Sequence, residues 1–148
     1  MNIHIATDHA GFALKETLLA YVRDELGHTV HDHGAYAYDE HDDYPPFMAA
    51  VAQEVAKDAS ARGIILGGSG QGEAMVANRT RGVRAAVYYG GPFDIVRLSR
   101  EHNDANILSL GARFLSEEDA KTAVRMWLGT DFSHEERHRR RIAQIDAV

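Results

Sequence analysis

The residues best placed to do chemistry are the glycines and the one carboxylate of the segment GGSGQGE at 67–73. Four glycines let the backbone approach a ligand closely and direct several N–H groups at one point, which suits an anion or a developing oxyanion. Glu73 has two interpretations: a charge that caps the following helix, or a general base beside an oxyanion hole. For the glycines alone, the simpler alternative is a tight strand-to-helix turn.

The segment does not match the common glycine-rich motifs. A dinucleotide fingerprint needs a third small residue where Glu73 stands, and a Walker loop needs a following Gly-Lys-Ser/Thr. A hydrolase nucleophile elbow around Ser69 needs a glycine where Gln71 stands. The pattern therefore points away from all three sites.

Two further segments carry side chains for acid–base chemistry and anion binding. His102 and Asn103 come shortly before an apolar run, although a lone histidine there is more often a surface or packing residue. Arg137 and Arg141 are four residues apart and share a face on a helix, so both guanidinium groups could hold one phosphate. A solvated basic helix face is the alternative, and composition alone favours it.

The acidic, histidine-rich stretch from 31 to 43 could instead chelate a metal. His31 and His33 form a His-x-His pair, which can hold a divalent ion. The other candidate ligands in the stretch are Asp32, Asp39, Glu40, His41, Asp42 and Asp43. Because no second spaced pair of ligands accompanies them, we favour a solvated loop and predict neither a metal nor another cofactor.

Short apolar runs alternate with longer amphipathic runs, and these elements must position the candidate residues. The strands that we expect are 2–7, 29–32, 63–66, 85–88 and 107–110, and the helices are 12–26, 44–58, 72–79, 92–101, 116–128 and 133–147. This alternation predicts an α/β three-layer sandwich around a parallel sheet. Ligands of such sheets bind beyond the carboxyl ends of the strands. Asp8, His9, the 67–73 loop and Arg113 follow strands directly and are expected there.

Length and composition limit the function classes. The chain has 148 residues, no cysteine and a formal net charge of -6, so we expect one domain over 1–148 without disulfides or a cysteine nucleophile. Residues 1–60 carry 11 acidic and 3 basic side chains, whereas 61–148 carry 11 acidic and 13 basic ones. The overall acidity disfavours nucleic-acid binding. Without a long apolar run or a leader-like start, we expect a cytoplasmic protein that binds no membrane.

Taken in order, the motifs resemble those of the type B ribose-5-phosphate isomerases, a family that also includes galactose- and allose-6-phosphate isomerases. The resemblance covers essentially the whole chain. The matching pieces are DHAG at 8–11, DYP at 43–45, the 67–73 loop with Ala77-Asn78, Arg84-Ala85, SREHNDAN at 99–106, Gly111-Ala112-Arg113 and Arg137-His138-x-x-Arg141. The resemblance implies a Rossmann-like αβα sandwich with a five-stranded parallel sheet and no dinucleotide. It also implies a homodimer, or a dimer of dimers, with active sites at the interface.

The resemblance further implies aldose–ketose isomerisation of a sugar phosphate in the pentose phosphate pathway. His102 would open the furanose ring, with Asn103 beside the reacting oxygens. The residues that would form the anion hole for the enediolate are Gly68, Ser69, Gly70, Gln71 and Gly72. Asp8, His9, Tyr44 and also Asp43 would line the site. The phosphate clamp would be Arg113, Arg137 and Arg141, the last two reaching across with His138 on the helix at about 133–147.

Gly67 departs from the commonest family pattern. Many members place a cysteine base there, whereas another subgroup lacks it and has a glutamate at the position of Glu73. This chain resembles the second subgroup, so Glu73 is the predicted base that moves the proton between C2 and C1. The expected reaction interconverts D-ribose 5-phosphate and D-ribulose 5-phosphate. The alternatives are the same isomerisation of a four- or six-carbon sugar phosphate, such as allose 6-phosphate, and a non-catalytic phosphate-binding α/β module.

Overall fold

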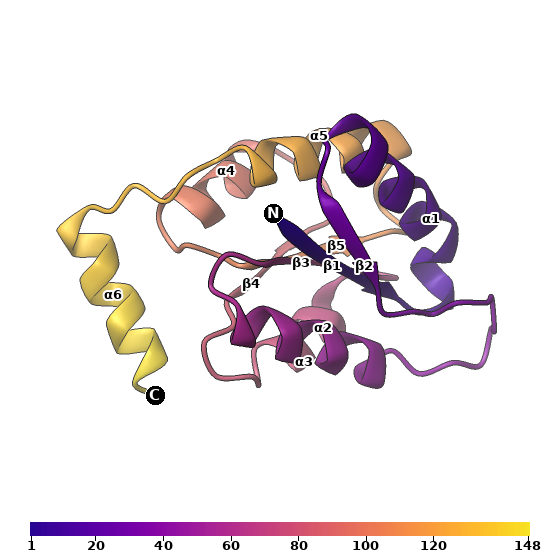
Figure 1. Ribbon diagram of the computed structural model, residues 1–148, viewed down its shortest axis with the longest axis horizontal. Coiled ribbons are helices and arrows are strands. Elements are labelled where there is room, and N and C mark those ends of the chain that lie inside the picture. The colour runs from indigo at the N-terminus through magenta and orange to yellow at the C-terminus, as the bar shows by residue number, and fades with distance from the viewer.

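Five parallel strands form the centre of the computed structural model, which describes residues 1–148 (Figure 1). The strands are β1 (Asn2–Thr7), β2 (Thr29–Asp32), β3 (Arg62–Gly67), β4 (Ala85–Tyr88) and β5 (Ile107–Gly111). Their order across the sheet is β2-β1-β3-β5-β4, and every neighbouring pair is parallel. The central strands β3 and β5 are almost completely buried, as expected of a parallel sheet that is covered on both faces.

Helices cover both faces of this sheet (Figure 1). On one face lie α1 (Phe12–Ala20), its π-helical continuation η2 (Tyr21–Glu25), α4 (Asp94–Glu101) and α5 (Glu117–Leu128), and on the other lie α2 (Pro45–Lys57) and α3 (Gln71–Ala77). Successive strand side chains point to opposite faces. Ile5 accordingly belongs to one buried hydrophobic cluster and Ala6 to the other. The predicted three-layer α/β sandwich is confirmed.

The last helix, α6 (Glu136–Asp146), extends beside the sandwich (Figure 1). It begins three residues after the predicted start at 133, because the Ser133 backbone is hydrogen-bonded to α4 and does not continue the helix. The Ser133 backbone N–H donates to the carbonyl of Glu101 at 3.0 Å, and the Ser133 hydroxyl lies 2.8 Å from Nδ1 of His138. Ser133 thereby ties the segment before α6 to the end of α4.

Helix α3 ends at Ala77, earlier than the predicted residue 79. The side chain of Asn78 accepts from the Ala85 N–H at 2.8 Å and donates to the Ala85 carbonyl at 3.1 Å. Asn78 thus binds the start of β4 through its side chain where the helix stops. None of the helices is long and apolar enough to cross a membrane.

Because all strands run in the same direction, the sheet has two chemically different edges. Asp8, Gly68 and Ala112 follow β1, β3 and β5 and lie at the carboxyl edge. The residues that precede the strands, among them Asn103 and Asp104 before β5, lie at the opposite amino edge. This division determines which of the predicted site residues can meet within one chain.

Candidate active site

A cavity of about 490 Å³ opens at the carboxyl edge of the sheet. The predicted site residues that line it are Asp8, His9, Tyr44, Gly68, Ser69, Gly72, Glu73 and Arg113. They come from the ends of β1, β3 and β5, from the start of α2 and from the first turn of α3, which carries Gly72 and Glu73. We call this group the strand-end pocket. Parallel strands bring these distant segments together, as the sequence predicts.

Close packing requires glycine at three positions of the 67–73 loop. A Cβ atom at Gly67 would overlap the Glu73 carboxylate, and one at Gly72 would overlap the Tyr44 hydroxyl. Gly70 has φ +77° and lies against the backbone of Leu110 and Gly111, which also favours glycine. Glu73 therefore folds back beneath the loop into space that a side chain at position 67 would otherwise occupy.

Glu73 is a buried carboxylic acid, only 4 % exposed. This burial raises its pKa, and the negative charge of Asp8 acts in the same direction. The backbone N–H groups of Glu73 itself and of Gly70 act in the opposite direction and lower the pKa. A carboxyl group held in this way is a stronger base once ionised than an exposed one, and it faces the cavity.

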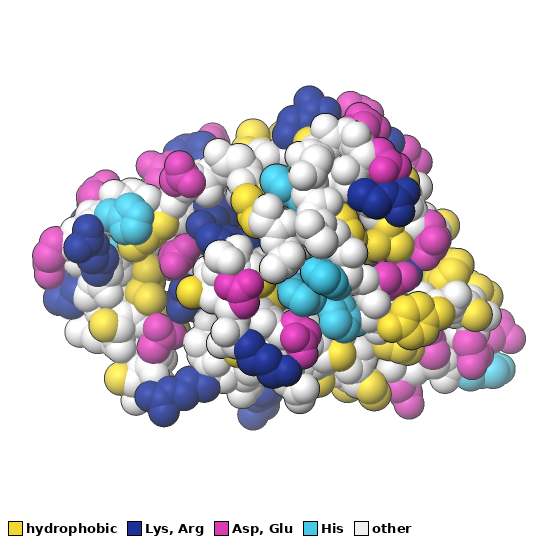
Figure 2. All heavy atoms as spheres, in the orientation of Figure 1, with side chains coloured by type: hydrophobic (Ala, Val, Ile, Leu, Met, Phe, Trp, Pro, Cys, Tyr) yellow, Lys and Arg dark blue, Asp and Glu magenta, His cyan; other side chains and the backbone are white.

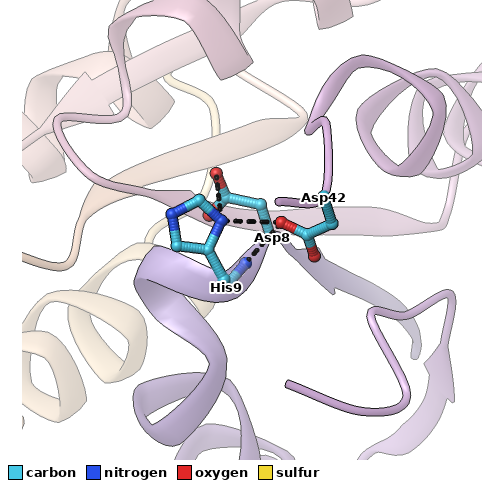
Figure 3. Close-up of side chains that lie close together, drawn as sticks. All are labelled: Asp8, His9 and Asp42. Carbon is cyan, nitrogen blue, oxygen red and sulfur yellow. Dashed lines mark hydrogen bonds and ion pairs between the residues drawn. The ribbon is translucent and has the colours of Figure 1, made fainter. Parts of the chain in front are cut away.

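A second acidic group fixes the ring of His9 (Figure 3). Asp42 Oδ1 accepts from the His9 backbone N–H at 3.0 Å and from the His9 ring at Nδ1 at 2.7 Å. The hydrogen bond to Asp42 raises the pKa of His9, and the charge of Asp8 adds to this effect. Since Nδ1 carries the proton that Asp42 accepts, Nε2 is the ring atom free to contact a ligand.

Asp42, which the sequence places in a solvated loop, is the residue at this site that sequence reasoning does not find. It lies 33 residues from His9, and its only signal in the sequence is its position next to Asp43-Tyr44. Asp8, His9 and Asp42 offer ligand atoms within 4.8 Å of one another and could hold a cation. The hydrogen bonds between His9 and Asp42 give the arrangement a second use, which is to orient the His9 ring. Asp43 is exposed and does not line the cavity.

Arg113 provides the positive charge of the pocket. Its backbone N–H donates to the Gly68 carbonyl at 3.1 Å, which sets the end of β5 against the glycine loop. Its guanidinium group lies beside Gly68. Arg113 forms no ion pair within the chain, so its charge is available to an anion. Gln71 is exposed outside the cavity lining, and Gly70 lies beneath it.

The remaining predicted residues form a separate group, which we call the helix-end cluster: His102, Asn103, Arg137, His138 and Arg141. The rings of His102 and His138 pack at 4.3 Å between centroids. Burial lowers the pKa of His138, and His102 adds to this shift. None of the five lines the strand-end pocket. Asn103 lines a larger cavity of about 600 Å³ between the sandwich and the end of α6.

The length of β5 separates the two groups within one chain. His102 and Asn103 precede this strand, whereas Arg113 follows it. Five strand residues at about 3.3 Å each span roughly 16 Å. A small sugar phosphate in the strand-end pocket therefore cannot also contact the helix-end cluster of the same chain.

Hydrogen bonds from Arg84 and Arg100 fix the turn that carries His102 and Asn103. Arg84 donates to the carbonyls of Asn103 and Asp104 at 3.0–3.2 Å and pairs with the Asp104 carboxylate at 3.2 Å. Arg100 donates to the other Asp104 oxygen at 2.7 Å. On α6, Arg137 pairs with Glu135 at 2.8 Å, whereas Arg141 forms no ion pair. The cluster thus presents exposed guanidinium groups on a fixed framework.

Comparisons with known proteins agree with this geometry. The model of a family described as Ribose/Galactose Isomerase matches residues 3–145. A ribose-5-phosphate isomerase B of Mycolicibacterium paratuberculosis is 39% identical over 96% of this chain and 87% of that protein. The Escherichia coli K12 protein of the same name is 38% identical over 99% and 95% of the two chains. The solved structure of ribose-5-phosphate isomerase B from Mycoplasma genitalium with bound ribulose-5-phosphate has a TM-score of 0.93, with 35% identity and coverage of 99% and 94%.

Proposed function

Because the chain belongs to the ribose/galactose isomerase family, we propose that it interconverts D-ribose 5-phosphate and D-ribulose 5-phosphate through an enediolate, with Glu73 as the base. The observation that carries the proposal is the buried Glu73 carboxylate, which faces a cavity at the carboxyl edge beneath a glycine loop. The reaction is an aldose–ketose isomerisation, and it is a step of the pentose phosphate pathway.

Glu73 performs the proton transfer. Its carboxylate removes the proton from C2 of the open-chain aldose, and the C1 carbonyl oxygen takes up the negative charge. The proton of the C2 hydroxyl then passes to O1, C1 takes up the proton from Glu73, and C2 is left as the ketone carbonyl. Burial raises the pKa of Glu73 and so makes it a better acceptor at neutral pH. A positioned base of this kind contributes about 10²–10⁴-fold to the rate.

The glycine loop stabilises the charge that Glu73 creates. We assign the backbone N–H groups of 68–72 and the Ser69 hydroxyl, which accepts from the Gln71 N–H at 3.3 Å, as the donors to the oxygen that becomes negative. One such donor is worth about 10²–10³-fold in rate. His9, oriented by Asp42, and Asp8 contact the hydroxyl groups of the sugar from the end of β1.

The position of Glu73 also accounts for Gly67. The carboxylate occupies the space above Gly67, where a side chain at this position would project. A cysteine base at position 67 and a glutamate base at position 73 would therefore act at nearly the same point. We assign the chain to the glutamate subgroup of its family for this reason.

A second subunit completes the site. The helix-end cluster lies at the amino edge, away from the pocket of its own chain, and α6 extends beside the sandwich (Figure 1). In a homodimer, α6 brings Arg137, His138 and Arg141 to the partner's strand-end pocket, where the arginines join Arg113 around the phosphate. His102 and Asn103 of the partner subunit's cluster then act on the ring oxygen and the reacting oxygens.

Ketose formation from four-, five- and six-carbon aldose phosphates, measured with a chelator present, tests this function. We expect the highest kcat/KM with D-ribose 5-phosphate and a loss of at least 100-fold in Glu73→Gln. The matched control is Glu118→Gln, the same substitution at an exposed glutamate on α5. Absence of turnover with every substrate would refute the isomerase function, and a preference for the six-carbon aldose would reassign the substrate.

A further inference from the structure

Three histidines that the proposed reaction does not use lie side by side on β1 and β2. His4 pairs with His31 across the two parallel strands, and the His33 backbone N–H continues the ladder by donating to the Ile5 carbonyl at 2.8 Å. Side chains at 31 and 33 point to the same face because strand side chains alternate. Figure 2 shows histidine side chains gathered on this face of the molecule, over β2.

The rings of these histidines are in direct contact. Nδ1 of His4 lies 2.8 Å from Nε2 of His33, and the His31 ring stacks on His4 at 4.8 Å between centroids with an interplanar angle of 17°. A contact between two ring nitrogens can hold only one proton, so at least one of the two presents a lone pair to the other. One ring nitrogen of the pair therefore donates a proton and the other accepts it.

A metal ion can take the place of that proton if both rings turn toward it. Two imidazole nitrogens bound to one tetrahedral Zn²⁺ at about 2.0–2.1 Å each are roughly 3.3 Å apart. The 2.8 Å separation of His4 and His33 must widen by about half an ångström, and each ring must turn by roughly 35° so that its lone pair points at the ion. His31 is exposed, and it joins the same ion by turning its ring out of the stacked position, in which its Nε2 lies 3.4 Å from Oδ1 of Asn2.

Carboxylates lie near the three rings and attract a cation. Burial lowers the pKa of His4 and of His33, whereas the negative charges of Glu54 on α2 and of Asp58 act on His4 in the opposite direction, as those of Glu54 and Asp32 do on His33. His4 is 9 % exposed and lies on the strand, which limits the conformational entropy lost on binding. The His-x-His pair in the sequence lacked another ligand nearby, and the fold supplies it from β1.

We propose that His4, His31 and His33 form a binding site for one borderline divalent cation of the Zn²⁺, Ni²⁺ or Cu²⁺ class. Imidazole nitrogens suit these ions, whereas Mg²⁺ and Ca²⁺ require oxygen ligands. His4 and His33 provide the first two ligands, His31 the third, and water the remaining position. The site stands apart from Glu73 and its cavity, so the proposal is independent of the isomerase function.

Calorimetric titration of the metal-free protein with ZnCl₂ at pH 7.5 tests the proposal. We expect one equivalent to bind, and at least a tenfold weaker affinity in His33→Gln and in His31→Gln. Both residues are half-buried or exposed, so these variants keep the fold even if His4→Gln does not. His41→Gln, in the same acidic stretch but outside the three-histidine contact, should bind Zn²⁺ as the unchanged protein does.

Two results would overturn the site. The first is unchanged stoichiometry and affinity in His31→Gln and His33→Gln. The second is loss of binding in His9→Gln with retention in His33→Gln, which would assign the ion to Asp8, His9 and Asp42 instead. Imidazole ¹⁵N NMR with and without Zn²⁺ provides a second measurement, in which the resonances of His4, His31 and His33 should shift and that of His28 should not.

Discussion

The strand-end pocket and the helix-end cluster divide the chemistry of the protein between two edges of one sheet. The pocket is rich in carboxylates, with Glu73 and Asp8 buried and Asp42 paired with His9. The cluster is basic, and its Arg137 and Arg141 are exposed on α6. An acidic pocket suits proton abstraction but repels phosphate, and a basic cluster has the opposite properties. Each edge thus lacks what the other provides, which is expected of a site shared between two subunits.

The largest effect on activity should come from removing Glu73 in one subunit and the arginines of the helix-end cluster in the other. Glu73→Gln alone and the double variant Arg137→Ala, Arg141→Ala alone should each lose at least 100-fold in kcat/KM. If the arginines serve the partner's pocket, a mixed dimer regains one intact site. After complete subunit exchange at equal amounts, about a quarter of the full activity should return, because half of the symmetric dimers are mixed and each holds one working site of two.

Subunit exchange must be demonstrated independently, for example by mass spectrometry of differently tagged subunits. Mixing each variant with itself provides the baseline. If exchange is complete and activity stays at that baseline, the arginines do not act across an interface, and the division into two complementary groups is wrong.

A smaller effect should come from the single substitution Arg141→Ala. A charged hydrogen bond to phosphate is worth about 1.5–3 kcal/mol, which corresponds to roughly 10–150-fold in kcat/KM. Arg139 lies on the same helix, is exposed and likewise forms no ion pair, so Arg139→Ala is the matched control. Steady-state kinetics should show the loss mainly in KM for Arg141→Ala. An equal loss in the two variants would point to a general effect of charge instead of a phosphate contact.

Much of this division is readable in the sequence, and the rest depends on side-chain packing. Apolar runs such as those of β3 and β5 predict buried parallel strands, and residues just after them predict the pocket. The same rule places His102 and Asn103 at the amino edge, since they precede β5, but the family resemblance grouped them with Glu73. The Asp42–His9 contact could not be predicted, because it joins a loop residue to the helical turn after β1, 33 positions away. Burial of Glu73 likewise depends on Gly67 being too small to displace it.

A third prediction concerns Asp42 as a positioning residue inside the strand-end pocket. Asp42→Asn retains an oxygen for the His9 N–H but removes the negative charge that raises the pKa of His9. NMR titration should show the pKa of His9 falling toward its ordinary value of 6.5. We expect kcat/KM to fall about tenfold, since the ring loses its fixed orientation. Asp39→Asn, in the same loop and exposed, should change neither quantity. An unaltered His9 titration in Asp42→Asn would contradict the contact.

The smallest effect is on the pH dependence of the folding stability, and it comes from the buried Glu73 of the strand-end pocket. Burial raises the pKa of Glu73 above the value of about 4.5 that it has in the unfolded chain. Below that pH the carboxyl group is protonated in both the folded and the unfolded state, so its ionisation does not lower the folding stability. As the pH rises through the unfolded and then the folded pKa, the unfolded chain releases its proton first, so folding stability is progressively lost. Glu73→Gln removes this loss while abolishing activity.

The Tm of Glu73→Gln should therefore match that of the unchanged protein near pH 4 and exceed it increasingly toward pH 8. Differential scanning calorimetry across this range measures the difference, with Glu118→Gln as the exposed control. A difference in Tm that is constant with pH would mean that Glu73 titrates normally. An inactive yet more stable variant is the behaviour expected of a carboxylate that the fold buries for chemistry, because its ionised form is unfavourable in the folded state and is needed only when a substrate proton must be removed.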